Sequence, residues 1–309
     1  MTRPPFVPED PQAAVPAAPI DAPVDPLFLS APRVSTFHGP QPLTNASGFF
    51  FEREGRLYLV TSRHVVIDDV SQHFPDRLEI ELHIDGTNLT RSTGFSIPLY
   101  DNGQAVWRQG LDSGGDIDVA VVEIDRSALP EATVIRAFTP AHLQTAFNEV
   151  VPGQSLLVVG FPLGFHDGLH HLPVLRQAVV ASPYGIRFQG HGYFLTDART
   201  HRGTSGAAVV MRDLGAPTDG SAILPWKLLG VHSARMDMGN RDLVLDESLG
   251  LNCAWYADIL LTLTEAREAA VEQAVVAAPP APDVVTVSDQ AATTAPVNTL
   301  TATGKGSPS

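Results

Sequence analysis

The stretch YFLTDARTHRGTSGAAVV (193–210) decides the fold, because it places two short apolar runs around one compact turn. Residues 193–197 and 207–211 have the length and apolar character of buried strands. The turn holds Ser205 between glycines, which allow the backbone shapes that a tight turn needs. Such a turn is also typical of a plain link between strands, so its meaning depends on the rest of the chain.

Runs of the same kind recur on both sides of this stretch, separated by clusters of Gly, Pro, Asn and Asp. They are SGFFFE (47–52), RLYLVT (56–61), LEIELHI (78–84), DVAVVEI (118–124), SLLVVGF (155–161), VLRQAVVA (174–181) and KLLGVHS (227–233). Short strands at fairly regular spacing, without a long amphipathic helix between them, indicate an all-β sandwich or barrel. One α-helix is predicted near the C-terminal end, over residues 255–274, where Leu260, Leu261, Leu263 and Ala266 approach helical spacing.

The two ends of the chain differ in composition from the folded part, which we assign to residues 34–274. Residues 1–33 are rich in proline, and we predict a disordered arm there. Residues 275–309 are rich in Ala, Thr, Pro and Val and lack aromatic residues, which predicts a disordered tail. We expect any regulatory partner to bind through these two segments.

Charge and cysteine content exclude several classes of function. The 309 residues carry a formal net charge of −14 and no run of Lys or Arg, so a nucleic-acid partner is not expected. No apolar stretch approaches the roughly 20 residues that cross a bilayer, and no secretory signal is visible, so we expect a cytoplasmic protein without a membrane partner. Cys253 is the only cysteine, which excludes an intrachain disulfide and a thiolate metal cluster.

Three remote residues have the chemistry of nucleophilic catalysis. His64 follows the run LYLVT, Asp118 opens the run DVAVVEI, and Ser205 lies in the turn described above. A serine hydroxyl is a weak nucleophile unless a neutral imidazole accepts its proton, and a carboxylate on the other ring nitrogen fixes the tautomer of that imidazole. Glycine lets main-chain N–H groups approach the developing oxyanion, and the N–H groups of Gly203 and Ser205 are the candidates. Asp116 is the alternative carboxylate.

The segments SGFFFE, LYLVTSRHVV, DVAVVEI, VVGFPLG, YFLTDARTHRGTSGAAVV and LLGVHS resemble the trypsin-like serine peptidases of the chymotrypsin fold. They are most similar in style to the bacterial branch that includes the high-temperature-requirement proteases. The resemblance covers roughly residues 34–265 and implies two six-stranded antiparallel β-barrels. It also implies a serine endopeptidase in which His64, Asp118 and Ser205 form the catalytic triad and the reaction proceeds through an acyl-enzyme intermediate. The implied substrate is a protein or peptide, and no cofactor is expected.

The turn departs from the family pattern at two positions. Ala207 stands where the family has a second glycine, and Thr204 stands where animal digestive relatives have the aspartate that pairs with a newly cut N-terminus. Activation of that kind is therefore not expected. These departures keep a second hypothesis open, in which the same fold has lost catalysis and serves as a protein-binding module. An α/β-hydrolase would need its serine before the acid and the histidine, and the order here excludes it.

The substrate pocket implied by the resemblance is lined by Arg199, Thr200, His232 and Ser233. The string GVH is similar to one found in glutamate-specific and glutamine-cleaving relatives. A threonine hydroxyl and an imidazole can hydrogen-bond a carboxylate or a carboxamide, so Glu or Gln is expected before the scissile bond. The alternative is that His232 only packs in the core and the pocket is shallow.

The string GFHDGLHH contains three histidines, His166, His170 and His171, which suggest a metal site. Its glycines and aspartate predict a loop, and no third type of ligand accompanies the histidines. We therefore predict a solvated loop and no metal.

Overall fold

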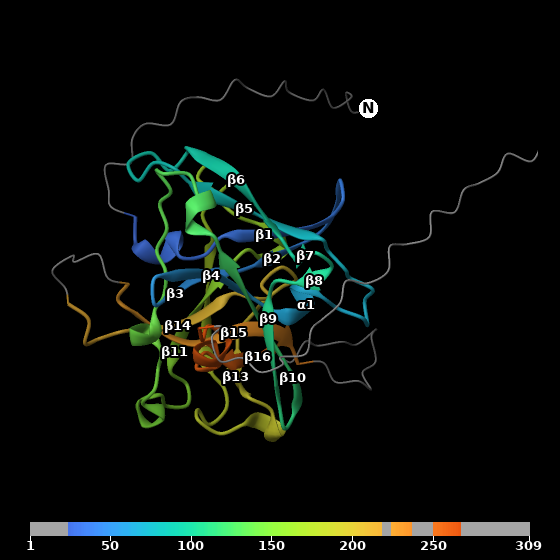
Figure 1. Cartoon of the computed structure of the whole chain (residues 1–309). Coiled ribbons are helices and arrows are strands. Elements are labelled where there is room, and N and C mark those ends of the chain that lie inside the picture. Colours follow the sequence, from blue (N-terminus) through green and yellow to red (C-terminus); the bar gives the residue numbers. More distant parts are fainter. Residues whose placement is uncertain (1–23, 218–223, 237–249, 267–309) are drawn as a thin grey trace, which may run out of the picture. The chain divides into compact units, whose positions relative to one another are not determined.

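The computed structural model of the chain describes residues 24–217, 224–236 and 250–266, and strands make up most of its regular structure (Figure 1). The prediction of an all-β protein is confirmed. All the pairings between the named strands are antiparallel, as the short runs and tight turns of the sequence lead one to expect.

The N-terminal half forms two four-stranded sheets and a small two-stranded ribbon. The sheets have the strand orders β2-β1-β5-β6 and β3-β4-β10-β9, and β7 pairs with β8. The strands are β1 (Arg33–His38), β2 (Gln41–Ser47), β3 (Phe49–Arg53), β4 (Arg56–Thr61), β5 (Arg77–His83), β6 (Ser92–Pro98), β7 (Tyr100–Asp101), β8 (Gln104–Ala105), β9 (Arg108–Asp112) and β10 (Gly115–Ile124). Only Gly48 separates β2 from β3, so the chain passes almost directly from one sheet to the other.

The C-terminal half forms a closed barrel with the strand order β11-β12-β13-β16-β15-β14, which β14 and β11 close by pairing. The strands are β11 (Ser155–Gly160), β12 (Val174–Val180), β13 (Tyr193–Asp197), β14 (Ala208–Arg212), β15 (Trp226–Arg235) and β16 (Leu251–Tyr256). One six-stranded antiparallel barrel is thus confirmed. The N-terminal half has its strands in two sheets, and a second closed barrel stays a prediction.

The helices within the described residues are all short. They are α1 (Arg63–Val66), α2 (Ile259–Leu263) and the 3-10 turns η1 (Pro26–Leu29), η2 (Arg126–Ala128), η3 (Pro140–His142), η4 (Phe147–Glu149), η5 (Pro162–Gly164) and η6 (Phe188–Gly190). The predicted helix over 255–274 begins later, at Ile259, because Trp255 and Tyr256 belong to β16 and pair within the barrel. Residues 267–274 of that prediction lie outside the described residues.

The predicted N-terminal arm differs from the structure at its end. Residues 24–32 are described, and they include η1, whose Leu27 is fully buried in the same core as Phe138. The structure therefore differs from the predicted arm over residues 24–32, because Leu27 and Ala31 pack in the core although the segment is rich in proline. Residues 1–23 and the predicted tail over 275–309 lie outside the described residues.

Alternation along the strands builds three apolar cores. On β10, Ile117, Val119 and Val121 enter one core, while Ala120 and Val122 enter another inside the N-terminal half. On β14, alternate side chains likewise enter the first core or a third one inside the barrel. The first core therefore contains side chains from both halves, and it holds together the sheet of β3, β4, β10 and β9 and the barrel.

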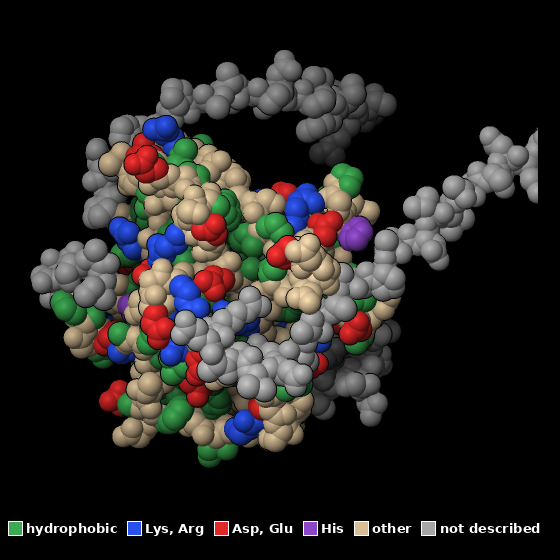
Figure 2. All heavy atoms as spheres, viewed as in Figure 1, with side chains coloured by type: hydrophobic (Ala, Val, Ile, Leu, Met, Phe, Trp, Pro, Cys, Tyr) green, Lys and Arg blue, Asp and Glu red, His purple; other side chains and the backbone are tan. Residues whose placement is uncertain are grey.

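The described surface carries charges of both signs, and Figure 2 shows acidic and basic side chains interspersed over the face in view. None of the helices in the described part of the chain has the length and apolar character to cross a bilayer.

Candidate active site

The pairing of two strands brings His64 to Asp118. In the register of β4 and β10, Ala120 lies opposite Thr61, so two residues back along β10 lie level with the residues that follow β4. His64 sits in the single turn of α1, directly after β4. Its ring Nδ1 lies 2.7 Å from Asp118 Oδ2, and its main-chain N–H donates to Asp118 Oδ1 at 2.9 Å. Two separate bonds therefore orient the imidazole.

A bulge in β10 aims Asp118 at His64. Against β9, Ile117 pairs with Gly110 and Ala120 pairs with Gln109, so the residues between them on β10 have no partner of their own. Bulges of this kind re-aim side chains next to functional sites. Asp116, the alternative carboxylate, is half exposed and pairs with Arg63 (3.4 Å) instead of with the histidine.

Burial and the neighbouring carboxylates shift the pKa of His64 in opposite directions. Burial favours the neutral ring and lowers the pKa, but the hydrogen bond and the negative charge of Asp118 raise it, with a smaller contribution from Asp68. The net result is a pKa above the usual 6.5. This is the behaviour expected of an imidazole that is stabilised when it becomes an imidazolium.

Ser205 lies on a turn that only glycine can make in this setting. Gly203 and Gly206 on either side have φ values of +86° and +83°. A Cβ on Gly206 would also collide with the Ser47 carbonyl and the Thr61 hydroxyl of the N-terminal half. The turn thus connects β13 to β14 and packs against the N-terminal half, and Ser205 lies partly exposed at its tip.

Ser205 is linked to Asp118 through Ser233. The Ser205 hydroxyl donates to the main-chain carbonyl of Ser233 at 3.1 Å, and the Ser233 hydroxyl donates to Asp118 Oδ2. Among the described residues, Ser205 makes no hydrogen bond with His64. His64 and Asp118 are therefore bonded directly, whereas Ser205 is connected to Asp118 only through Ser233 of β15.

Two main-chain donors beside Ser205 are unused. The N–H groups of Gly203 and Ser205 donate to no acceptor within the described ranges, whereas the neighbouring N–H groups of Thr204, Gly206 and Ala207 are all bonded. Because a main-chain N–H rarely stays without an acceptor, this pair of free donors next to a hydroxyl is able to bind a negatively charged oxygen.

The four residues assigned to the substrate pocket differ in exposure and in the partners to which they are bonded. Arg199 is exposed, and its carbonyl accepts from Arg176. Thr200 is buried, and its hydroxyl donates to Asn252 Oδ1 at 2.5 Å. The Ser233 hydroxyl donates to Asp118, as described above, so this side chain faces the pair of His64 and Asp118. His232, its neighbour on β15, is only 2% exposed.

His232 is a buried imidazole with an unused ring atom. Its Nδ1 is buried and has no hydrogen-bond partner among the described residues. Burial, reinforced by the nearby His64 and opposed by Asp118, lowers the pKa of His232 from 6.5 to about 4. The ring is therefore neutral at physiological pH.

Two residues at the site escaped the sequence analysis. Asn252 on β16 donates to the carbonyls of Ala198 (2.8 Å) and Gly250 (2.9 Å). It therefore holds in place the segment after β13 that carries Thr200. Ser47 at the end of β2 bonds to the turn of Ser205. The string SGFFFE contains Ser47, but its pattern reveals only a strand.

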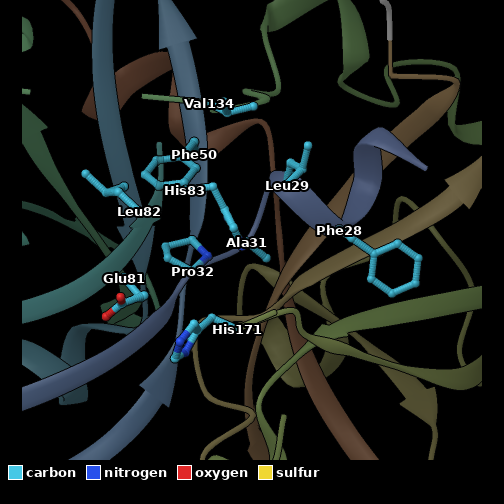
Figure 3. Close-up of a pocket in the computed structure, with 10 residues that line it drawn as sticks. All are labelled: Phe28, Leu29, Ala31, Pro32, Phe50, Glu81, Leu82, His83, Val134 and His171. Carbon is cyan, nitrogen blue, oxygen red and sulfur yellow. The ribbon is translucent and has the colours of Figure 1, made fainter. Parts of the chain in front are cut away.

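The histidine loop lies between β11 and β12 and contacts the N-terminal half. His83 Nε2 lies 2.6 Å from the His170 carbonyl, His170 pairs with Asp167, and His166 stacks on His171. In the described residues, no three His, Cys, Asp or Glu side chains are grouped so as to hold a metal ion. A small pocket lies here, and none of the predicted site residues lines it (Figure 3). Its lining residues are Phe28, Leu29, Ala31, Pro32, Phe50, Glu81, Leu82, His83, Val134 and His171.

Comparisons with known proteins identify the family of the chain. Residues 46–216 match the family described as Trypsin-like peptidase domain. A comparison with curated proteins gives no match. Among solved structures, the HtrA-type protease AlgW with tripeptide and a variant of it with tripeptide are similar at 18% identity, with TM-scores of 0.44 and 0.45. Each comparison covers 76% of this chain and 58% of the other, so this chain spans less than two thirds of their length.

The family match covers more than half of the 309 residues, and it includes His64, Asp118 and Ser205. The chain therefore belongs to the family of trypsin-like peptidase domains.

Proposed function

We propose that the protein is a serine endopeptidase in which Ser205 is the nucleophile, His64 the general base and Asp118 the orienting carboxylate. The observation that carries the proposal is the 2.7 Å contact between His64 Nδ1 and Asp118. It leaves the other ring nitrogen, Nε2, as the one that can accept a proton. A partly exposed serine beside two unused N–H donors supports the rest of the assignment.

The reaction follows from these positions. The Ser205 hydroxyl turns from the Ser233 carbonyl toward His64, passes its proton to Nε2 and attacks the substrate carbonyl. The N–H groups of Gly203 and Ser205 bind the oxygen that becomes negative. The imidazolium, stabilised by Asp118, then gives its proton to the leaving amine, and an acyl-enzyme remains. Water repeats the sequence with His64 as base, which releases the acid and restores the Ser205 hydroxyl.

A fluorophosphonate probe tests this assignment directly, because it phosphonylates only an activated serine. We expect the wild-type chain to be labelled on Ser205 and to cleave a peptide library. Ser205→Ala should lose the label and lower turnover about a million-fold, since triad members act as a unit. A labelled Ser205→Ala variant, or a wild-type chain that is neither labelled nor active, would contradict the proposal.

One observation favours the second candidate function, a binding module without catalysis. The Ser205 hydroxyl is bonded to the Ser233 carbonyl and not to His64. If that bond persists with substrate present, the chain binds peptides but does not label, and Ser205→Ala leaves peptide affinity unchanged. The labelling experiment therefore separates the two candidates.

For specificity, we propose that the enzyme accepts Gln or Glu before the scissile bond and prefers Gln at neutral pH. His232 supports this through its burial, its unpartnered Nδ1 and its neutral state. A neutral imidazole can hydrogen-bond an amide without any change of charge. A carboxylate next to it would be a buried, unpaired charge unless a proton is taken up on binding.

The ratio of kcat/KM for the Glu peptide to kcat/KM for the matched Gln peptide shows whether a proton is taken up when the Glu peptide binds. Because a pKa of about 4 leaves His232 neutral near pH 7, the ratio should rise about tenfold for each pH unit lowered between pH 8 and 6. The protonation of His64 cancels in the ratio, since both substrates need it equally. A ratio that stays flat with pH, or a library profile dominated by basic or apolar residues, would contradict the specificity proposal alone.

A further inference from the structure

One buried hydroxyl joins the two halves of the molecule at the candidate site. Ser47 is fully buried at the end of β2. Its Oγ donates to the Gly203 carbonyl at 2.7 Å and accepts the Phe161 N–H at 2.9 Å. Its main-chain N–H donates to the Ser205 carbonyl at 2.9 Å, and its carbonyl accepts from Thr61 Oγ1 at 2.8 Å. Every polar group of this residue therefore has a partner.

These bonds determine which way the peptide groups around Gly203 point. The Ser47 hydroxyl holds the Gly203 carbonyl, while the Leu163 N–H holds the Arg202 carbonyl at 2.6 Å. The Gly203 N–H belongs to the same peptide group as the Arg202 carbonyl, so the bond from Leu163 fixes its direction and leaves it unused. The Ser47 hydroxyl fixes the next peptide group, which begins with the Gly203 carbonyl. If the peptide group before Gly203 turned over, it would present a carbonyl to the oxyanion in place of a donor.

The surroundings are built to accommodate this hydroxyl. Gly160, at the end of β11, has no side chain where a Cβ would lie 2.5 Å from Ser47 Oγ. The bond from Phe161 then fixes η5, which packs directly against Gly203. Ser47 thus positions both the turn of Ser205 and the segment behind it.

From this geometry we infer that Ser47 is a positioning residue for the oxyanion site. It keeps the site open by holding the Gly203 carbonyl and by fixing, through Phe161, the segment whose Leu163 N–H holds the Arg202 carbonyl. The inference rests on the proposed peptidase function. Ser47 touches no reacting atom, and its effect on the reaction passes through Gly203.

The test is Ser47→Ala in the full chain, with kcat expressed per site titrated by a fluorophosphonate. We expect kcat to fall about ten- to a hundredfold, less than the hundredfold or more seen when an oxyanion donor itself is removed, and KM to change less than threefold. A peptide aldehyde forms a hemiacetal by adding the Ser205 hydroxyl across its C=O bond, so its affinity should fall by the same factor as kcat/KM. The binding of the corresponding peptide amide, which is not attacked, should stay the same.

Ser182→Ala is the matched control. Like Ser47, Ser182 is a buried serine whose Oγ accepts a main-chain N–H, that of Leu195 at 2.9 Å, but it lies in the C-terminal half away from the turn of Ser205. This variant should lose stability as Ser47→Ala does but keep kcat and the aldehyde affinity. The midpoint of the acid limb of kcat should be unchanged in both variants, because the pair of His64 and Asp118 is untouched.

Two results would overturn the inference. One is a wild-type kcat in Ser47→Ala, and the other is equal losses of kcat in the two serine variants. If Ser47→Ala does not fold, Ser47→Cys keeps a weak donor and acceptor at the same place, and its kcat and aldehyde affinity must fall in parallel. A wild-type chain that neither labels nor cleaves refutes the proposed function, and this inference with it; a fully active Ser47→Ala variant refutes the inference alone.

Discussion

At the scale of single residues, the pH dependence of activity reports on the bond between Asp118 and His64. The base must be neutral to accept a proton, so activity is present above the pKa of His64 and is lost as the pH falls through it. Since Asp118 raises that pKa above 6.5, the acid limb of kcat/KM should have its midpoint above pH 6.5 in the wild type. Asp118→Asn removes the main contribution that raises the pKa and leaves burial, which is the largest influence and lowers it, opposed only by the smaller contribution of Asp68. The midpoint should move below 6.5, while kcat falls about ten-thousand-fold.

Asp116→Asn is the control for this prediction, because Asp116 lies on the same strand but pairs with Arg63 at a half-exposed position. It should leave the pH midpoint unchanged and kcat within about a factor of two of the wild-type value, as expected for a surface ion pair. A midpoint that moves equally in both variants would mean that overall charge, rather than the bond to His64, sets the pKa.

At the scale of elements, the turn between β13 and β14 depends on glycine for two separable reasons. Gly206 needs a positive φ of +83°, and it has no room for a Cβ next to Ser47 and Thr61. Gly103, in the turn between β7 and β8, has a similar φ of +77° but open space around it. Gly103→Ala should therefore cost only the backbone term, about 1–2 kcal/mol of unfolding free energy. Gly206→Ala should cost several kcal/mol and abolish labelling of Ser205.

Denaturant unfolding of the two variants measures the difference. Equal losses of stability would show that the contact with the N-terminal half is relieved by a shift of the turn, and that only the backbone conformation matters at Gly206.

The sequence predicts the elements better than it predicts their junctions. Alternating apolar runs identify strands such as RLYLVT and DVAVVEI, because the faces of those strands enter different cores and need apolar side chains on both. The pairing of His64 with Asp118 follows once the strands on either side of them are placed antiparallel. The bulge at Asp118, the role of Ser233 and the four bonds of Ser47 are set by contacts between remote segments, and no local pattern encodes them.

At the scale of the whole molecule, the two halves share one core and should unfold together. Phe49, Tyr58 and Val121 of the N-terminal half pack in the same cluster as Val231 and Leu260 of the C-terminal half. The end of α2 is also bonded across the boundary, since Arg53 donates to the Leu261 carbonyl and Arg108 donates to the carbonyls of Leu263 and Glu265. The candidate site lies on this boundary, so its geometry depends on both halves being folded.

Leu260→Ala tests this coupling. Leu260 is fully buried, and its truncation should cost about 3 kcal/mol, which raises the population of the globally unfolded chain on the order of 100-fold. If the halves unfold together, amide exchange through global unfolding must accelerate by the same factor in β4 of the N-terminal half and in β13 of the barrel, although the variant lies in neither strand. Val70→Ala, at a side chain that is 95% exposed, should change neither rate. Acceleration confined to the barrel would show that the N-terminal half is stable without it. The boundary that carries His64, Asp118 and Ser205 would then be a docked interface between two separately stable parts.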